Sequence, residues 1–249
     1  MRPSVPDVRI TDSQDDELSV YRSVSGQAVV ALIFGLLAPA AFLGRALWAV
    51  PAIGVLISLG ALRRIRRNEP AMVGRRLALV GLAFALLFGI AAPTNWLVHR
   101  IRVRGEATRL AAQWRRYISD DEPEKAFQLT LPTARRQPLD DNLKAVYRND
   151  QRMRQELDAY LGGGRFGETS VVRTLLDVGP KAQVTFDETA SQTQSAREDT
   201  VEQIFTVTYE EGGERKSLHV SLLMIRTNFP DGTAEWRIAR TATAKPGDL

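Results

Sequence analysis

The chain has 249 residues, enough for one or two domains, and its 33 Lys and Arg against 29 Asp and Glu give a net charge of +4. It has no cysteine and only two histidines, which excludes disulfide scaffolds and zinc–thiolate sites, and no metal or cofactor is expected. The charge is unevenly spread: residues 1–25 carry −2, residues 26–104 carry +9 and residues 105–249 carry −3. Because the C-terminal part is acidic overall, a nucleic-acid partner is not expected.

The first 25 residues are acidic and lack any apolar periodicity. They contain Pro3, Pro6 and the acidic run Asp15–Glu17. A segment that cannot bury an apolar face has no core to fold around, so residues 1–25 are predicted to be a disordered tail.

Residues 26–104 are predicted to form a transmembrane domain. Within residues 26–62 the only charged side chain is Arg45. One helix of that length would run about 55 Å, whereas the hydrocarbon core of a bilayer is about 30 Å thick. Two spans, residues 27–43 and 46–62, with a turn at Gly44–Arg45 fit better, and a third is predicted at residues 77–98. The alternative for each is a buried helix of a soluble protein. No acidic or histidine side chain lies within a span, which argues against a pump or an ion-coupled transporter.

The segment between the second and third spans is rich in arginine. Its six arginines are Arg63, Arg64, Arg66, Arg67, Arg75 and Arg76. The positive-inside rule places this segment in the cytoplasm. Three spans then predict a multi-pass protein of the cytoplasmic membrane, with a cytoplasmic N-terminus and an extracytoplasmic domain at residues 105–249. We interpret the cluster as a topology determinant, with binding of anionic membrane lipids as the alternative.

Small residues recur at four-residue spacing in the spans. They are Gly54 and Ser58 in the second span and Gly81, Ala85 and Gly89 in the third. Such faces let helix backbones approach closely. They are predicted to pack the three helices together, with homo-oligomerisation as the alternative.

The membrane region resembles a known family. The residues that carry the resemblance are Ala61, Leu62, Ile65 and Arg66 at the end of the second span and Gly74, Arg75, Leu77, Ala78, Gly81 and Leu82 at the start of the third. They are similar to the motifs of the bacterial domain of unknown function 4190 family over about residues 25–92. The resemblance implies an integral membrane module that anchors a neighbouring domain, and it implies no catalytic residue.

From Gly105 the pattern is that of a soluble α+β domain. Apolar residues at helical spacing predict helices over 107–118, about 123–129 and 139–161. Period-two patterns predict strands over 171–178, 182–186, 201–209 and 218–224, and a last strand that contains Trp236 and Ile238. Residues 189–199 are predicted to be a polar loop, and 211–214 and 229–232 to be turns. Helices followed by an antiparallel sheet indicate an α+β domain.

This order of elements also resembles the nuclear-transport-factor-2-like fold. The residues that carry the resemblance are the segment 122–130, EPEKAFQLT, and the Trp236–Ile238 element. The resemblance covers residues 105–243 and implies a cone-shaped domain. Folds of this kind host isomerases, dehydratases and assembly domains, so the fold does not decide the function.

No catalytic motif is visible in the soluble domain. The polar candidates for a pocket are Tyr117, Tyr147, Asp187 and His219, and His219 is expected to face away from the core. We therefore expect a non-enzymatic interaction or scaffold domain with a protein partner in the cell envelope. The alternative is an isomerase or dehydratase acting on a small apolar molecule, which a cone filled by Trp114, Phe127, Phe205 and Trp236 would exclude. A transporter is the third hypothesis.

Overall fold

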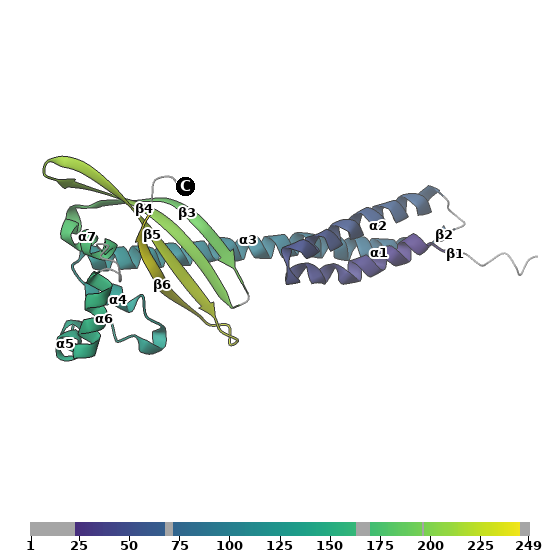
Figure 1. Cartoon of the computed structure of the whole chain (residues 1–249). Helices are drawn as coiled ribbons and strands as arrows, with labels where there is room; N and C mark the ends of the chain where they lie inside the picture. The colour runs from purple at the N-terminus through teal and green to yellow at the C-terminus, as the bar shows by residue number, and fades with distance from the viewer. Residues whose placement is uncertain (1–22, 68–71, 163–169, 196, 245–249) are drawn as a thin grey trace, which may run out of the picture. The chain divides into compact units, whose positions relative to one another are not determined.

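The computed structural model describes residues 23–67, 72–162, 170–195 and 197–244. The chain divides into two compact units, residues 1–99 and 100–249. Helix α3 (Arg75–Ser119) belongs to both units (Figure 1). The boundary expected after residue 104 lies inside this helix, and the third predicted span and the amphipathic helix at 107–118 are one element. The N-terminal tail is predicted over residues 1–25, and residues 1–22 of it lie outside the described residues.

The first unit consists of three apolar helical segments. Helix α1 (Gly26–Leu37) continues as the 3₁₀ helix η1 (Ala38–Leu43), and η2 (Arg45–Trp48) leads into α2 (Ala49–Arg67). A proline in the first turn of η1 accompanies the change of helix type. Residues 26–43, 45–67 and 75–119 form helices that are long and apolar enough to cross a membrane. The prediction of three apolar helices with a break at Gly44 is therefore confirmed.

A short pairing of two strands joins two segments of this unit that lie far apart in sequence. Strand β1 (Ser23–Val24) runs parallel to β2 (Met72–Val73). The pair places the start of α1 next to the start of α3.

The second unit is a helical segment followed by a four-stranded sheet, which confirms the predicted α+β order. After α3 come α4 (Pro123–Gln128), η3 (Thr133–Arg135), α5 (Leu143–Asn149), α6 (Gln151–Gly162), α7 (Val171–Val178) and η4 (Gly179–Lys181). The strands are β3 (Gln183–Gln194), β4 (Glu198–Glu211), β5 (Glu214–Asn228) and β6 (Ala234–Thr243). They form an antiparallel sheet in sequence order (Figure 1). Gly212 and Gly213, with φ of 65° and 84°, make the two-residue turn between β4 and β5.

The core of the second unit lies between α3 and the inner face of the sheet. Helix α3 contributes residues at helical spacing: Val103, Ala107, Leu110, Ala111, Trp114 and Ile118. The strands contribute residues at period two: Val201, Phe205, Val207, Val220, Leu222, Met224 and Ile238. Phe127, Leu143, Tyr147 and Leu157 form a second cluster. The apolar residues whose spacing predicted the helix at 107–118 and the strands at 201–209 and 218–224 are the residues that fill this core.

The helix predicted over 139–161 is divided into α5 and α6 at Asp150 and begins only at Leu143. Two further sequence predictions in this unit assign the wrong element. Residues 171–178 form helix α7 instead of a strand, with Val171, Val172 and Leu175 buried. A short apolar run fits either element, and here packing against the core decides. Residues 189–199 are mostly strand instead of a polar loop, since β3 extends to Gln194 and β4 begins at Glu198. An edge strand that is largely exposed on both faces needs no apolar alternation, so the sequence pattern missed it.

Candidate functional site

The predicted arginine segment forms a surface cluster, which we call the basic cluster: Arg63, Arg64, Arg66, Arg67, Arg75 and Arg76. All six side chains are exposed. They lie at the C-terminal end of α2 and the N-terminal end of α3. Beneath them Ala28, Ala61, Ile65 and Ala78, from all three helices, pack into one buried cluster.

The small residues predicted to pack helices lie between the helices of the first unit. A Cβ atom added to Gly81 would lie 2.4 Å from the carbonyl oxygen of Ala31 in α1. One added to Gly54 would lie 3.2 Å from the Cβ atom of Ala85. Similarly, one added to Gly89 would lie 3.3 Å from the Cβ atom of Pro51 in α2. Ser58 is buried, and its hydroxyl donates to the Gly54 carbonyl at 2.7 Å.

Two tryptophans and an arginine meet where η2 packs on α3. The rings of Trp48 and Trp96 lie 5.9 Å apart, edge to face. The guanidinium carbon of Arg45 lies 4.4 Å from the centre of the Trp96 ring. The only charge of residues 26–62 is thus held against an aromatic face.

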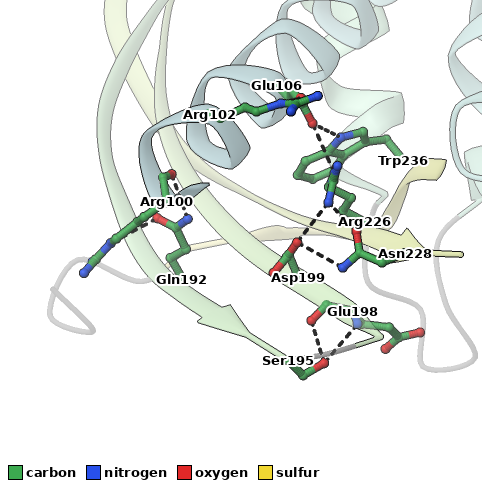
Figure 2. A network of polar contacts seen from close by, with 10 residues as sticks. All are labelled: Arg100, Arg102, Glu106, Gln192, Ser195, Glu198, Asp199, Arg226, Asn228 and Trp236. Atoms are coloured by element: carbon green, nitrogen blue, oxygen red, sulfur yellow. Dashed lines mark hydrogen bonds and ion pairs between the residues drawn. The ribbon is translucent and has the colours of Figure 1, made fainter. Parts of the chain in front are cut away.

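The best-built polar site of the second unit is an ionic network between α3 and the sheet (Figure 2). The Arg226 guanidinium donates to Glu106 at 3.2 Å and to Asp199 at 3.3 Å. Trp236 Nε1 donates to the same Glu106 oxygen at 3.0 Å. Asn228 accepts from Arg226 and donates to Asp199 at 3.3 Å. We call these five residues the α3–sheet network.

The charged groups of the α3–sheet network are more buried than charged side chains usually are. The side chain of Asp199 is 1% exposed and that of Arg226 is 11% exposed. Burial alone would raise the pKa of Glu106, but the hydrogen bonds from Trp236 and Arg102 and the charge of Arg226 outweigh it and hold this pKa below its usual value. A buried set of paired charges holds one geometry, so the network fixes α3 on the sheet.

Sequence reasoning missed this network, although one signal for it exists. Leu218, Val220, Leu222 and Met224 alternate on β5, and Arg226 continues the same alternation. A charged residue at an inward position requires a buried partner. The strand pattern therefore indicated an inward arginine, but not the carboxylates that meet it.

Two further contacts extend the same region. Arg100 and Gln192 exchange hydrogen bonds: the Arg100 guanidinium donates to the Gln192 side chain at 3.3 Å, and that side chain donates to the Arg100 carbonyl at 3.0 Å (Figure 2). The hydroxyl of Ser195 donates to the Glu198 carbonyl at 2.7 Å and accepts from the Glu198 amide at 2.9 Å. They tie the edge strand β3 to α3 and close the β3–β4 connection.

The polar candidates for a pocket do not converge. Asp187 and His219 lie on the outer face of the sheet, where Thr206 donates to Asp187 at 2.5 Å and lies 3.0 Å from the His219 ring. Asp187 sits at a bulge within β3, whereas it was expected at the end of a strand. Tyr147 is in the second core cluster, where burial raises its pKa to about 12 and Gln128 donates to its hydroxyl. Tyr117, on α3, accepts from Gln113.

The cavity between α3 and the sheet is small. Its lining includes Trp114, Val184, Phe205 and Leu222, and its volume of about 20 Å³ has room for about one water molecule. Trp114 and Phe205 are almost wholly buried in it, while Phe127 belongs to the second core cluster. Among the described residues no group of His, Asp or Glu is arranged to hold a metal ion.

Arg115 is the one charged side chain in the lining of this cavity. Its guanidinium lies over the Phe205 ring at 5.2 Å and donates to the Val184 carbonyl at 3.4 Å. Burial lowers its pKa. The contacts place this side chain against the apolar wall.

Comparison with known proteins finds no protein family, no curated protein and no solved structure that matches the chain.

Proposed function

We propose that this is an integral membrane protein that anchors an α+β interaction domain. The observation that carries the membrane assignment is the packing of the first unit. Its interior is made of small side chains, including Ala28, Ala31, Ala61, Ala78 and Ala85, all 0% exposed. Its exposed surface is made of large apolar side chains, including Leu36, Leu43, Leu56, Leu87 and Ile90. A surface of this kind is unfavourable in water and fits a bilayer.

The length of the unit agrees with a bilayer. Arg76 of the basic cluster and Trp96 are 20 positions apart in α3, which corresponds to about 30 Å of helix. This is about the thickness of the hydrocarbon core. Arginines at one end and tryptophans at the other are the residues that favour the two membrane interfaces.

The positions of the arginines favour one orientation. The six arginines of the basic cluster and Arg22 would lie on one side of the membrane, and Arg45, Arg100, Arg102 and Arg104 on the other. The larger number favours the cytoplasm for the basic cluster. The N-terminus is then cytoplasmic and the second unit extracytoplasmic, in a multi-pass protein of the cytoplasmic membrane. We propose that this module is similar in kind to the domain of unknown function 4190 family, on the motifs at residues 61–66 and 74–82 alone, since no family model matches the chain.

The second unit is best explained as a binding domain, related in architecture to the nuclear-transport-factor-2-like fold. The cavity between α3 and the sheet offers about 20 Å³, far less than the several hundred Å³ of a usual small-molecule site. A larger hollow of about 380 Å³ is lined by residues that include Lys181, Thr208 and Arg215, and it contains none of the pocket candidates Tyr117, Tyr147, Asp187 and His219. The inward charged groups of the α3–sheet network are used to hold α3 on the sheet. A surface that meets a protein of the envelope needs neither an internal pocket nor a catalytic group.

The first experiment tests membrane insertion and orientation. Membranes from cells that express the full chain are washed with alkaline carbonate, which removes peripheral proteins. Alkaline phosphatase, active only outside the cytoplasm, and green fluorescent protein, fluorescent only inside, are each fused after Leu249 and after Arg67. We expect a carbonate-resistant chain, phosphatase activity at Leu249 and fluorescence at Arg67. Release by carbonate would overturn the membrane assignment, and the reversed reporter pattern would overturn the orientation.

The second experiment tests the binding role in intact cells. A photo-crosslinking amino acid replaces exposed apolar residues of the second unit, Phe186 (48% exposed) and Phe229 (42% exposed) in turn. The matched control places it at buried Leu222. We expect a defined adduct from an exposed position that is absent from the control. The absence of adducts from exposed positions throughout the sheet would contradict a binding role.

A further inference from the structure

The basic cluster carries charge that the described part of the chain does not neutralise. All six arginines are exposed, and none forms an ion pair within residues 23–67 and 72–99, which contain no Asp or Glu. In the second unit, by contrast, many arginines pair with carboxylates. These are Arg102, Arg116, Arg135, Arg152, Arg173, Arg226 and Arg240. Exposed guanidinium groups without a carboxylate partner among the described residues can take their counter-charge from an anionic ligand.

The arginines project from helix ends that the fold holds together. Ala61 and Ile65 of α2 pack against Ala78 of α3 and Ala28 of α1. The turn before α3 contains Gly74 at φ 136°, where a Cβ atom would lie 3.0 Å from the Cβ atom of Ala28. A side chain is disfavoured at that φ, so the turn depends on glycine. The guanidinium groups are thus displayed at one end of a packed helical unit.

We infer that the basic cluster is a binding site for the headgroups of anionic phospholipids. This inference rests on the proposed membrane insertion, which brings the cluster to the level of the headgroups. The positive charge of an arginine attracts the phosphate oxygens of a headgroup, and its aliphatic stem can lie along apolar surface. Each basic side chain near an anionic membrane surface strengthens attraction by about fivefold. A zwitterionic headgroup carries its own ammonium, so the site discriminates against it.

A topology determinant acts during insertion and needs no lasting ligand, whereas a lipid site binds its ligand in the finished bilayer. The two roles are separated in reconstituted membranes, where the orientation of the chain no longer matters. The full chain is placed in phosphatidylcholine bilayers with a trace of spin-labelled phosphatidylglycerol or spin-labelled phosphatidylcholine. Electron paramagnetic resonance then gives the relative affinity of the protein for the two lipids.

Three variants accompany the wild-type chain. The first replaces Arg63, Arg64, Arg66 and Arg67 by Gln, and the second replaces the same four by Lys, which keeps the charge. The third is a control that removes four exposed arginines of the second unit by substitution with Gln: Arg148, Arg173, Arg197 and Arg215.

We expect the wild-type chain to prefer phosphatidylglycerol by at least about fivefold. The Gln variant of the cluster should show little preference, while the Lys variant and the control should keep it. A wild-type chain without preference, or a Gln variant that keeps it, would overturn the inference. Equal losses in the Lys and Gln variants would overturn it as well, because charge would then not be the cause. A chain that resists carbonate yet shows no preference would overturn the lipid site and leave the membrane assignment in place.

Discussion

The two units of this chain are packed in opposite ways. In the first unit Ala, Gly and Ser lie between the helices, and Leu, Ile and Phe lie on the surface. In the second unit Trp114, Leu222 and Met224 lie in the core, and the strand residues on the outer face are largely polar. Water drives large apolar side chains into the interior of a protein, whereas surrounding lipid does not. In lipid, helices are held together instead by close contact between their backbones. This opposite packing supports the proposal that the two units face different solvents.

A large side chain at a close helix contact should destabilise the first unit more strongly than any other change considered below. In a Gly81→Leu variant the new Cβ atom would meet the Ala31 carbonyl at 2.4 Å, so α1 and α3 must separate. We expect a loss of stability of about 3 kcal/mol or more and little folded protein in the membrane fraction. The measurement is the yield and melting temperature of the detergent-purified chain.

Gly60→Leu is the matched control, since Gly60 lies in α2 with no heavy atom within 4 Å of its added Cβ atom. This variant should resemble the wild-type chain in yield and melting temperature. If both variants behave alike, close backbone contact does not hold the first unit together.

The next effect concerns the ionic contacts that set the second unit apart from the first. In an Arg226→Met variant Asp199, 1% exposed, and Glu106 lose the guanidinium that bridges them. Breaking a buried ion pair costs about 3–5 kcal/mol. We expect faster hydrogen exchange in β4 and β5, measured by mass spectrometry on the reconstituted chain.

A triple variant tests whether charge is the cause. Glu106→Gln and Asp199→Asn, added to Arg226→Met, remove the stranded carboxylates, so much of the protection should return. If the triple variant exchanges as fast as the single one, the loss comes from packing and not from uncompensated charge.

The third prediction compares the same substitution, Leu to Ala, in the two units. Leu222→Ala removes a side chain that is 0% exposed, and we expect a loss of about 3 kcal/mol. Leu87→Ala, at a position 60% exposed on α3, should cost less than about 1 kcal/mol. Hydrogen exchange of each unit in bilayers measures both. Comparable losses in the two units would contradict the opposite packing described above.

The elements that could be predicted from the sequence are those whose hydrophobic pattern is set by contact with a single solvent. The three apolar helices were found because long uncharged runs are rare outside membranes. Strands β4 and β5 were found because one face of each is buried, as the alternation ending at Met224 indicates.

The elements that were missed depend on neighbours that the local sequence does not reveal. Residues 171–178 carry enough apolar residues for a strand or a helix, and contact with the core selects helix α7. Strand β3 extends through residues 189–194, where edge pairing with β4 needs no buried face. The α3–sheet network joins Glu106 to Arg226, 120 positions apart, so only the fold brings these charges together.

A weaker consequence is a pH dependence of stability that is confined to the second unit. The pKa of Glu106 is held below its usual 4.5. A carboxyl group with a lowered folded-state pKa contributes its stability above its unfolded-state pKa and loses it as the pH falls through the folded-state pKa. We therefore expect the protection factors of amides near Glu106, which compare the measured exchange rate with the intrinsic rate at each pH, to fall below about pH 4.5. A Glu106→Gln variant should be less stable at neutral pH and should lack this component of the acid response, while Glu214→Gln, at the exposed start of β5, should keep it. The first unit has no described carboxylate between residues 23 and 99, so its protection factors should stay unchanged over the same range. An acid response shared by both units would mean that the network does not carry the effect.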